Sequence, residues 1–294
     1  MNTIIYYAVV PLVFLISRLP FFILYRVSDV LFLFIYYVFK YRRRVVFQNL
    51  TNSFPEKNIS EIKTIEKAYY RFFCDFLVES IKYLTINEKE IRQRCVIDEN
   101  ELLKRLNKEK QSVICVLGHY GNWEWAAPAF SLQAKHQLFV IYKPLSNKRF
   151  DALMYRIRSR FGTKLIAMQS VIREMLRNKN TFSSTIFVGD QTPSAENAFW
   201  IKFLNQETAV FKGTEVMAKK MNLPVVFVSV RRRKRGHYYV HYEMLCEKPL
   251  ETADGDISKA HTLMLEREIK QQPEIWLWSH RRWKHKKPTD MELI

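Results

Sequence analysis

An apolar strand-type run that leads directly into a helix start constrains the fold of this chain more than any other feature. Residues 112–118 read SVICVLG, a β-branched run that ends at glycine, and this pattern predicts a buried strand. Asn122 can cap a new helix that begins WEWAAPAF, although Pro128 limits its first turns. The segment therefore predicts a strand that passes through a turn into a helix.

The rest of the chain repeats this alternation of strands and helices. Asn58 and Glu61 form a capping-box pattern, which opens a long amphipathic helix that is expected to reach about residue 84. Further strands are predicted at residues 137–142, 184–188, 224–230 and 238–244, with helices at residues 150–160, 171–178 and 214–221. Such alternation predicts an α/β fold, with a mixed sheet flanked by helices.

His119 lies in the predicted turn and Glu124 at the start of the helix that follows. On one continuous helix these side chains would point about 140° apart, from ~3.6 residues per turn, and would be poorly placed to touch. With the histidine on the turn they can converge, and a base oriented by a carboxylate suits proton transfer from a hydroxyl. From these residues alone, a structural histidine and a general base are equally good interpretations.

Asp190, Gln191 and two arginines are further candidates. Asp190 follows the strand-type run STIFVG, so its carboxylate can orient a base, accept a hydrogen bond from a hydroxyl or cap the next turn. Arg158 and Arg160 lie at the end of a predicted helix. They are either ordinary helix-end cations or ligands for an anion, because an arginine fork can hold a phosphate bidentately.

The net charge of +18 predicts an anionic partner: nucleic acid, an acidic protein or phosphorylated lipid at a membrane surface. Aromatic residues at 14% and an apolar N-terminus favour the membrane. The four cysteines are scattered without a Cys-x-x-Cys pair. This pattern indicates reduced thiols in a cytoplasmic setting and argues against a disulfide scaffold or a zinc site.

Residues 1–44 are predicted to form a membrane anchor or interfacial segment, followed by a cytoplasm-facing domain over residues 45–294. A spanning helix needs about 20 mostly apolar residues, and residues 3–25 supply them if Arg18 snorkels; residues 21–39 are a poorer second candidate. A re-entrant hairpin and a pair of helices lying in the interface remain as alternatives. The basic cluster that follows predicts a cytoplasmic flank with candidates for membrane contact at Arg42, Arg43 and Arg44.

The C-terminal run WLWSHRRWKHKK, residues 276–287, interleaves tryptophans with cations. This composition is typical of a membrane interface, and it also suits single-stranded nucleic acid through stacking and phosphate contacts. The candidates for membrane contact in this run are Trp276, Trp278, Arg281, Arg282 and Trp283.

The segment HYGNWE, residues 119–124, resembles the HX4E box of the bacterial lipid A late acyltransferases. Five other segments resemble the same family in the same order: RRRVVFQNLTNSFPE, YKPLSNKRFDALMYRIRSRFG, GDQTP, KGTEVMAKKMNLPVV and PEIWLWSHRRWK. The resemblance therefore covers nearly all 294 residues, and its specificity lies in six boxes that occur in order.

The resemblance implies a glycerolipid-acyltransferase-like fold with an N-terminal membrane-anchor helix. It also implies transfer of a fatty acyl chain from an acyl carrier protein thioester to a hydroxyl of a lipid A precursor at the inner membrane. His119 would be the general base and Glu124 the residue that orients it, with Asp190 and Gln191 beside the acyl-transfer site. One of the two candidate arginines would hold the anionic glycolipid acceptor. No metal, organic cofactor or nucleic-acid partner is expected.

Three rival functions remain. An acyltransferase of the same superfamily could act on a lysophospholipid, glycerol phosphate or an amino-acid lipid. A membrane-tethered nucleic-acid-binding protein would use the charge and the basic-aromatic tail, but would leave the HX4E box without a purpose. A non-catalytic lipid-binding scaffold would have lost its key residues, whereas His119 and Glu124 are both present.

Overall fold

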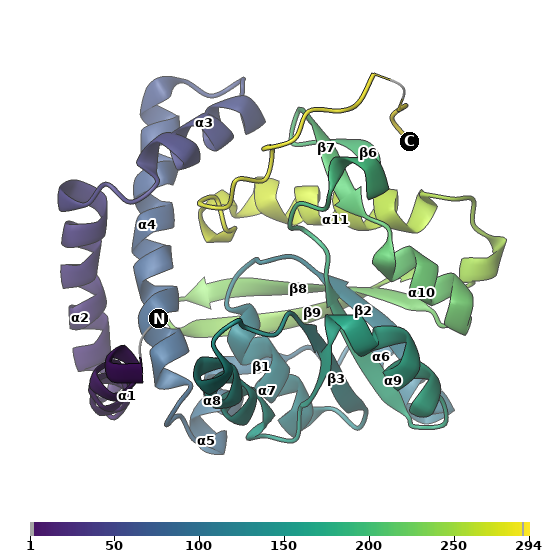
Figure 1. Ribbon diagram of the computed structural model, residues 1–294, viewed down its shortest axis with the longest axis horizontal. Coiled ribbons are helices and arrows are strands. Elements are labelled where there is room, and N and C mark those ends of the chain that lie inside the picture. Colours follow the sequence, from purple (N-terminus) through teal and green to yellow (C-terminus); the bar gives the residue numbers. More distant parts are fainter. Residues whose placement is uncertain (1–2, 290) are drawn as a thin grey trace.

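The computed structural model describes residues 3–289 and 291–294, and its centre is a seven-stranded sheet flanked by helices (Figure 1). The strand order is β1-β9-β8-β2-β5-β3-β4, and β6 and β7 form a separate antiparallel ribbon. The strands are β1 (Cys95–Ile97), β2 (Val113–Leu117), β3 (Gln137–Tyr142), β4 (Lys164–Ala167), β5 (Ser183–Val188), β6 (Ala198–Phe203), β7 (Gln206–Phe211), β8 (Val225–Lys234) and β9 (His237–Cys246).

The sheet is mixed, which confirms the predicted α/β fold. Strands β8, β2, β5, β3 and β4 run parallel, β9 is antiparallel to β8, and β1 is parallel to β9. Strands β2 and β5 are neighbours, paired from Val113↔Ser184 to Leu117↔Val188. Because their carboxyl ends meet at the same edge, the residues that follow these two strands are brought side by side.

The helices connect the strands and cover the sheet. They are α1 (Thr3–Ser17), α2 (Phe21–Leu33), α3 (Arg43–Ser53), α4 (Ile59–Lys82), α5 (Glu88–Arg94), α6 (Glu101–Glu109), α7 (Trp123–Gln133), α8 (Lys148–Ser159), α9 (Val171–Arg177), α10 (Gly213–Met221) and α11 (Asp256–Gln271). A π-helical turn, Phe34–Val38, continues α2. Short 3-10 turns are η2 (Met168–Ser170), η3 (Ala195–Asn197), η4 (Pro249–Glu251) and η5 (Pro273–Ile275).

Helix α4 is the predicted long helix, and the predicted capping box is present at its start. The Asn58 side chain accepts a hydrogen bond from the backbone of Glu61, and the Glu61 carboxylate accepts one from the backbone of Asn58. Its buried face carries Tyr69, Tyr70 and Phe72 into the main core, so most of its aromatic stripe serves packing.

The N-terminal segment does not contain the continuous helix that we expected over residues 3–25. Pro20 separates α1 from α2, and the 15-residue α1 would be only about 22 Å long, short of a bilayer core of ~30 Å. Among the described residues, one helix is long and apolar enough to cross a membrane, Phe21–Val38, which matches our second candidate. Helix α2 lies alongside α4 (Figure 1).

Candidate active site

The turn between β2 and α7 is built as the sequence predicted. A Cβ at Gly121, where φ is +63°, would lie 1.9 Å from the carbonyl oxygen of Val230, so the turn requires glycine. Asn122 caps α7, since its Oδ1 accepts a hydrogen bond from the backbone N–H of Trp125 at 3.0 Å. The turn therefore presents His119 at the carboxyl end of β2, immediately before α7.

The carboxylate that holds His119 is Asp190, not Glu124. The distance from His119 Nδ1 to Asp190 Oδ1 is 2.5 Å, and the backbone N–H of His119 donates to Asp190 Oδ2 at 2.7 Å. Trp276 Nε1 donates to the same Oδ2 at 2.8 Å. Our expectation that Glu124 orients the imidazole is therefore wrong in geometry, because Asp190 arrives from the neighbouring strand with two bonds to the same residue.

This pairing shifts the pKa values of both groups. Burial by itself would lower the pKa of His119, but the charge and hydrogen bond of Asp190, helped by the charge of Glu124, outweigh it and raise that pKa. Burial would raise the pKa of Asp190, yet the His119 charge and the hydrogen bonds from His119 and Trp276 hold it well below its usual range. Asp190 is therefore ionised, and its Oδ1 accepts a hydrogen bond from the protonated Nδ1 of His119.

Glu124 forms a two-point ion pair with Arg158. Arg158 Nε donates to Glu124 Oε2 at 3.0 Å, and Nη2 donates to Oε1 at 2.5 Å. Both residues line the same cavity as His119. The guanidinium of Arg158 therefore lies in the cavity wall, and its two bonds to Glu124 fix the orientation of its plane.

The structure distinguishes the two candidate arginines. Arg160 Nη1 donates to the carbonyl oxygens of Tyr83 and Leu84, both at 2.7 Å, and Nη2 donates to Ile86 at 3.0 Å. Arg160 thus caps the chain that leaves α4 and does not line the cavity. Its assignment as a substrate ligand is wrong, and Arg158 is the arginine that faces the site.

A cavity of about 540 Å³ opens beside His119. Its walls come from the carboxyl halves of β2, β3 and β5, from β4, and from α7, η2, α9 and α10, and most of its lining side chains are apolar. His119, Glu124, Arg158 and Gln191 supply polar groups, and Gln191 Nε2 lies 3.3 Å from His119 Nε2. The cavity is therefore an apolar pocket that ends at an imidazole.

Two of the three tryptophans of the C-terminal run, Trp276 and Trp278, are core residues, whereas Trp283 is half-buried. Trp276 and Trp278 are buried at 2% and 0% exposure, and Arg282 is buried at 2%. Trp278 Nε1 donates to the carbonyl of Pro273 at 2.6 Å, and Trp283 Nε1 donates to Thr208 Oγ1 at 2.7 Å. Membrane contact is therefore wrong for Trp276, Trp278 and Arg282, and buried indoles cannot stack on bases either.

The same run, with the residue before it, is instead hydrogen-bonded to the His119 turn and to Asp190. The backbone N–H of Gly121 donates to Ile275, and that of Leu277 donates to His119. Together with the Trp276–Asp190 bond, these hydrogen bonds hold the His119 turn in place. Composition alone gave no signal for this role, because tryptophan beside cations is common both at interfaces and in cores.

The other candidates for membrane contact differ in exposure. Arg42, Arg44 and Arg281 are exposed, whereas Arg43 is half-buried and its Nε donates to Glu66 at 2.9 Å. The side chain of Arg42 also donates to the carbonyl of Ser279 at 3.0 Å, so this basic cluster lies against the C-terminal run.

Glu79 on α4 supports the site, and sequence analysis did not identify it. It is fully buried and accepts hydrogen bonds from Asn122 Nδ2 at 2.7 Å and from the hydroxyls of Tyr25 and Tyr238, both at 2.8 Å. Burial raises the pKa of Glu79 to about 7, against the opposing effect of these bonds. Since Asn122 caps α7, Glu79 holds the residue that sets the start of this helix.

Within residues 3–289 and 291–294, no group of three or more His, Cys, Asp or Glu side chains is placed to hold a metal ion. The four cysteines are free thiols, and three of them are buried.

Comparison with known proteins identifies the family of this chain. The fold is mixed α/β, and a His–Asp pair lies beside a pocket with mostly apolar walls. A family model described as bacterial lipid A biosynthesis acyltransferase matches residues 1–285, so the chain belongs to that family and is an O-acyltransferase.

Individual relatives share low sequence identity with this chain but match it over most of its length. The lipid A biosynthesis lauroyltransferase of Escherichia coli (strain K12) is 20% identical over 278 residues, which covers 94% of this chain and 90% of the relative. The lipid A biosynthesis myristoyltransferase of Escherichia coli (strain K12) and the lipid A biosynthesis acyltransferase 1 of Shigella flexneri are each 20% identical over 255 residues, with 86% of this chain and 78% of the relative covered.

Proposed function

We propose that this protein transfers a fatty acyl chain from an acyl carrier protein thioester to a hydroxyl of a lipid A precursor at the cytoplasmic face of the inner membrane. The observation that carries the proposal is a His–Asp pair whose imidazole lines a 540 Å³ cavity with mostly apolar walls. The family and the names of the relatives support lipid A as the acceptor.

His119 is proposed as the general base. With its Nδ1–H bonded to Asp190, the lone pair on Nε2 is available to the acceptor hydroxyl. The hydroxyl oxygen attacks the thioester carbon while its proton passes to Nε2, and Asp190 stabilises the imidazolium that forms. The tetrahedral intermediate then expels the carrier thiolate, which takes that proton. No acyl-enzyme is needed, because the segment HYGNWE contains neither serine nor cysteine.

Arg158 is proposed to hold an anionic oxygen of the glycolipid acceptor, with Glu124 as its positioning residue. Glu124 occupies Nε and Nη2 of the guanidinium, which fixes the orientation of the cation in the cavity wall. The charge of Arg158 also opposes protonation of His119, which helps to keep the base neutral.

The cavity is proposed to hold the acyl chain of the donor. Burying each methylene of a chain in such an apolar space contributes about 0.8 kcal/mol, so a long chain binds far better than a short one until the space is filled. The pocket crosses the carboxyl ends of β2, β5, β3 and β4, and three strand spacings correspond to about 14 Å across the sheet.

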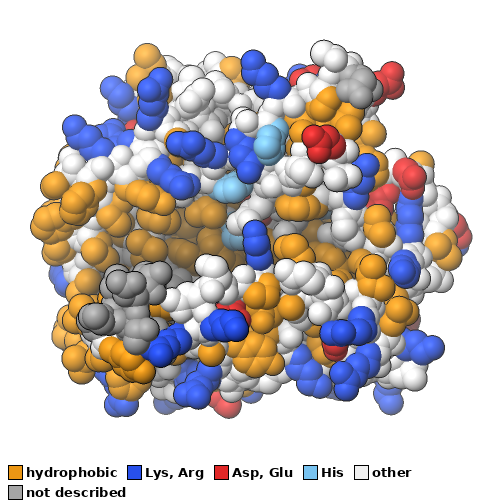
Figure 2. Space-filling model, viewed as in Figure 1, with side chains coloured by type: hydrophobic (Ala, Val, Ile, Leu, Met, Phe, Trp, Pro, Cys, Tyr) orange, Lys and Arg blue, Asp and Glu red, His pale blue; other side chains and the backbone are white. Residues whose placement is uncertain are grey.

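Aromatic ring contacts next to His119, which we call the aromatic row, support a lipid acceptor. Tyr41 stacks on Phe73 at 6.0 Å between ring centroids, Phe76 meets Trp123 at 4.2 Å, and Trp123 meets His119 at 4.9 Å. Figure 2 shows a hollow lined with hydrophobic side chains on the face it presents, with histidine, lysine and arginine side chains at its rim. An acyl-bearing, anionic acceptor matches that combination.

The decisive test is incubation of the purified protein with acyl carrier proteins of several chain lengths and a tetra-acylated lipid A precursor, followed by mass spectrometry. A product heavier than the precursor by one acyl group is expected, and it should disappear in His119→Ala while the melting transition is kept. Parallel reactions with lysophospholipid and glycerol phosphate identify the rival acceptors. Acylation of one of these, with no lipid A product, would refute the proposed acceptor.

A further inference from the structure

The helix Phe21–Val38 has the length and composition of a membrane span, yet one of its faces is bonded to the catalytic domain. Its buried side chains follow a strict spacing of four residues: Leu24, Ser28, Phe32 and Tyr36. This stripe packs against α4, so the inner face of the helix is already covered by protein.

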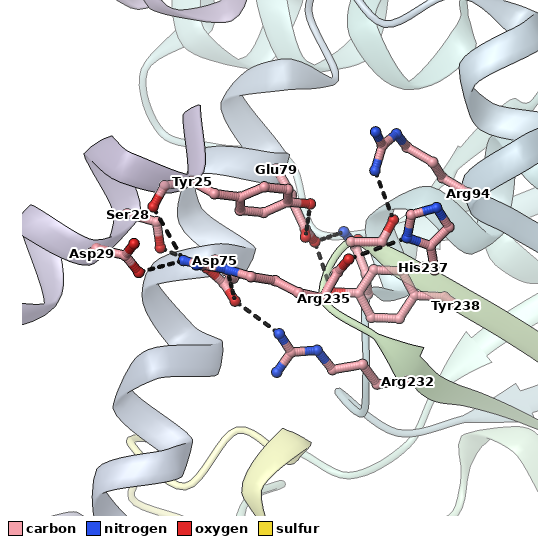
Figure 3. Close-up of polar contacts among 12 residues, drawn as sticks. Tyr25, Ser28, Asp29, Asp75, Glu79, Arg94, Arg232, Arg235, His237 and Tyr238 are labelled. Atoms are coloured by element: carbon pink, nitrogen blue, oxygen red, sulfur yellow. Dashed lines mark hydrogen bonds and ion pairs between the residues drawn. The ribbon is translucent and has the colours of Figure 1, made fainter. Parts of the chain in front are cut away.

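Polar bonds reinforce this packing at the middle of the helix (Figure 3). Ser28 Oγ donates to Asp75 Oδ1 at 2.7 Å, and Tyr25 donates its hydroxyl proton to Glu79 at 2.8 Å. Arg235, at the tip of the β8–β9 hairpin, donates to both Asp29 at 2.7 Å and Asp75 at 2.6 Å. The helix is thus tied to α4 and to the hairpin through buried and half-buried charges.

These ties are incompatible with a helix that crosses a bilayer. Asp29 and Val30 are the middle residues of Phe21–Val38, so in a spanning orientation Asp29 would lie at the bilayer centre. Asp75 and Arg235 would have to follow it there, or their bonds with α2 would break and leave charges without partners. Helix α4 carries exposed Lys67 and Arg71 alongside and could not enter the hydrocarbon either.

The outer face of the same helix is exposed and, apart from Arg26, apolar. We call this surface the membrane face: Phe22, Val30, Leu33, Phe34, Tyr37 and Val38. Exposed cations lie at its two ends, with Arg18 before α2 and Lys40 and Arg44 after the π-helical turn, and exposed Arg26 lies within it, four residues from both Phe22 and Val30. An exposed apolar stripe with cations at its ends, and one arginine whose long side chain can reach the head groups, fits the surface of an anionic bilayer.

We propose that Phe21–Val38 does not cross the membrane but lies in the surface of one leaflet of an anionic phospholipid bilayer, with the membrane face in the lipid. The catalytic domain is then held against the same leaflet by the bonds to Asp75, Glu79 and Arg235. The partner is the bilayer itself, whichever lipid is acylated, so this inference goes beyond acyl transfer.

A topology measurement on the full-length protein tests the orientation. Arg18→Cys and Arg44→Cys place single reporters at the two ends of the helix, in a Cys246→Ser background that leaves only buried native thiols. In sealed right-side-out membrane vesicles, a membrane-impermeant maleimide should label neither reporter until the vesicles are made leaky, and then both. Labelling of one reporter from outside and the other only from inside would show a spanning helix and overturn the proposal.

A binding measurement tests the membrane face itself. Leu33 on α2 and Leu263 on α11 are matched exposed leucines, at 53% and 49% exposure. In flotation with vesicles of phosphatidylethanolamine and phosphatidylglycerol, Leu33→Asp should bind roughly tenfold to a hundredfold more weakly, from the loss of one buried leucine, and Leu263→Asp should bind like the unaltered protein. Equal binding by both variants would contradict the assignment. Neither readout measures acyl transfer, so failure here leaves the proposed function untouched.

Discussion

Replacing Asp190 by asparagine tests the proposed base most sharply, because it keeps the shape of the side chain and changes only its charge and hydrogen-bonding pattern. The carboxylate accepts three hydrogen bonds: from His119 Nδ1 at 2.5 Å, from the His119 backbone at 2.7 Å and from Trp276 at 2.8 Å. If the asparagine oxygen keeps the hydrogen bonds from the His119 backbone and from Trp276, its NH2 group points toward His119 Nδ1. The imidazole must then carry its proton on Nε2, where it cannot act as a base.

The magnitude follows from two effects. A hydrogen bond to a charged group contributes about 1.5–3 kcal/mol, and Asp190 gives this stabilisation to the imidazolium that forms in the transition state. The wrong tautomer adds a further loss, so kcat of Asp190→Asn should fall roughly 10²–10⁴-fold.

The assay is initial-rate acyl transfer with a fixed acyl carrier protein and lipid A precursor, and the chain offers a matched control. His241 Nδ1 lies 2.6 Å from Asp98 Oδ2, a second His–Asp pair that does not line the cavity. Asp98→Asn should leave kcat unchanged. If Asp190→Asn retains full activity, or loses it only through a lowered melting temperature, the role of the His119–Asp190 pair is refuted.

The remaining predictions concern pH, binding, chain length and stability. Because Asp190 raises the pKa of His119 above its ordinary 6.5, kcat/KM should rise with pH through an inflection above that value. A profile that is flat between about pH 6 and 8, the range in which histidines ordinarily titrate, would contradict a histidine base. Arg158→Lys should raise KM for the anionic acceptor about tenfold with little change in the donor KM, since a lysine cannot keep both bonds to Glu124 and also present a fixed N–H to the acceptor, and an unchanged acceptor KM would remove Arg158 from the acceptor site. Leu165→Phe narrows the cavity on β4, the strand farthest from β2, so competition between donors should shift product masses toward shorter chains. Because burial raises the pKa of Glu79 to about 7, the folded protein keeps a proton that the unfolded chain releases near 4.5; the free energy of unfolding should therefore fall as pH rises between these values, and Glu79→Gln should flatten this dependence in denaturant titrations.

Much of the fold could be predicted from local patterns. The strand over residues 137–142 coincides with β3, and the helix over residues 171–178 with α9 to within one residue. The hairpin strands β8 and β9 extend further than predicted, because Arg231 and Arg232 still pair across the ladder. Local signals failed for β1 and β4, which are only three and four residues long and owe their conformation to their neighbours in the sheet.

The partners within the site could not be predicted in the same way. His119 and Asp190 are 71 residues apart, and they meet only because β5 lies beside β2 in the sheet although β3 and β4 intervene in the sequence. Glu124 is near His119 in sequence, but Arg158 from α8 binds it on both oxygens. Candidate residues could therefore be chosen from their position at strand ends, whereas their pairing depends on strand order.

The most direct test of the central claim is the mass of lipid A from cells that lack this protein. The account predicts lipid A that is lighter by one acyl chain, restored by a copy of the unaltered protein and not by a stably folded His119→Ala variant. Lipid A of unchanged mass in the deletion strain, with altered phospholipids instead, would contradict it.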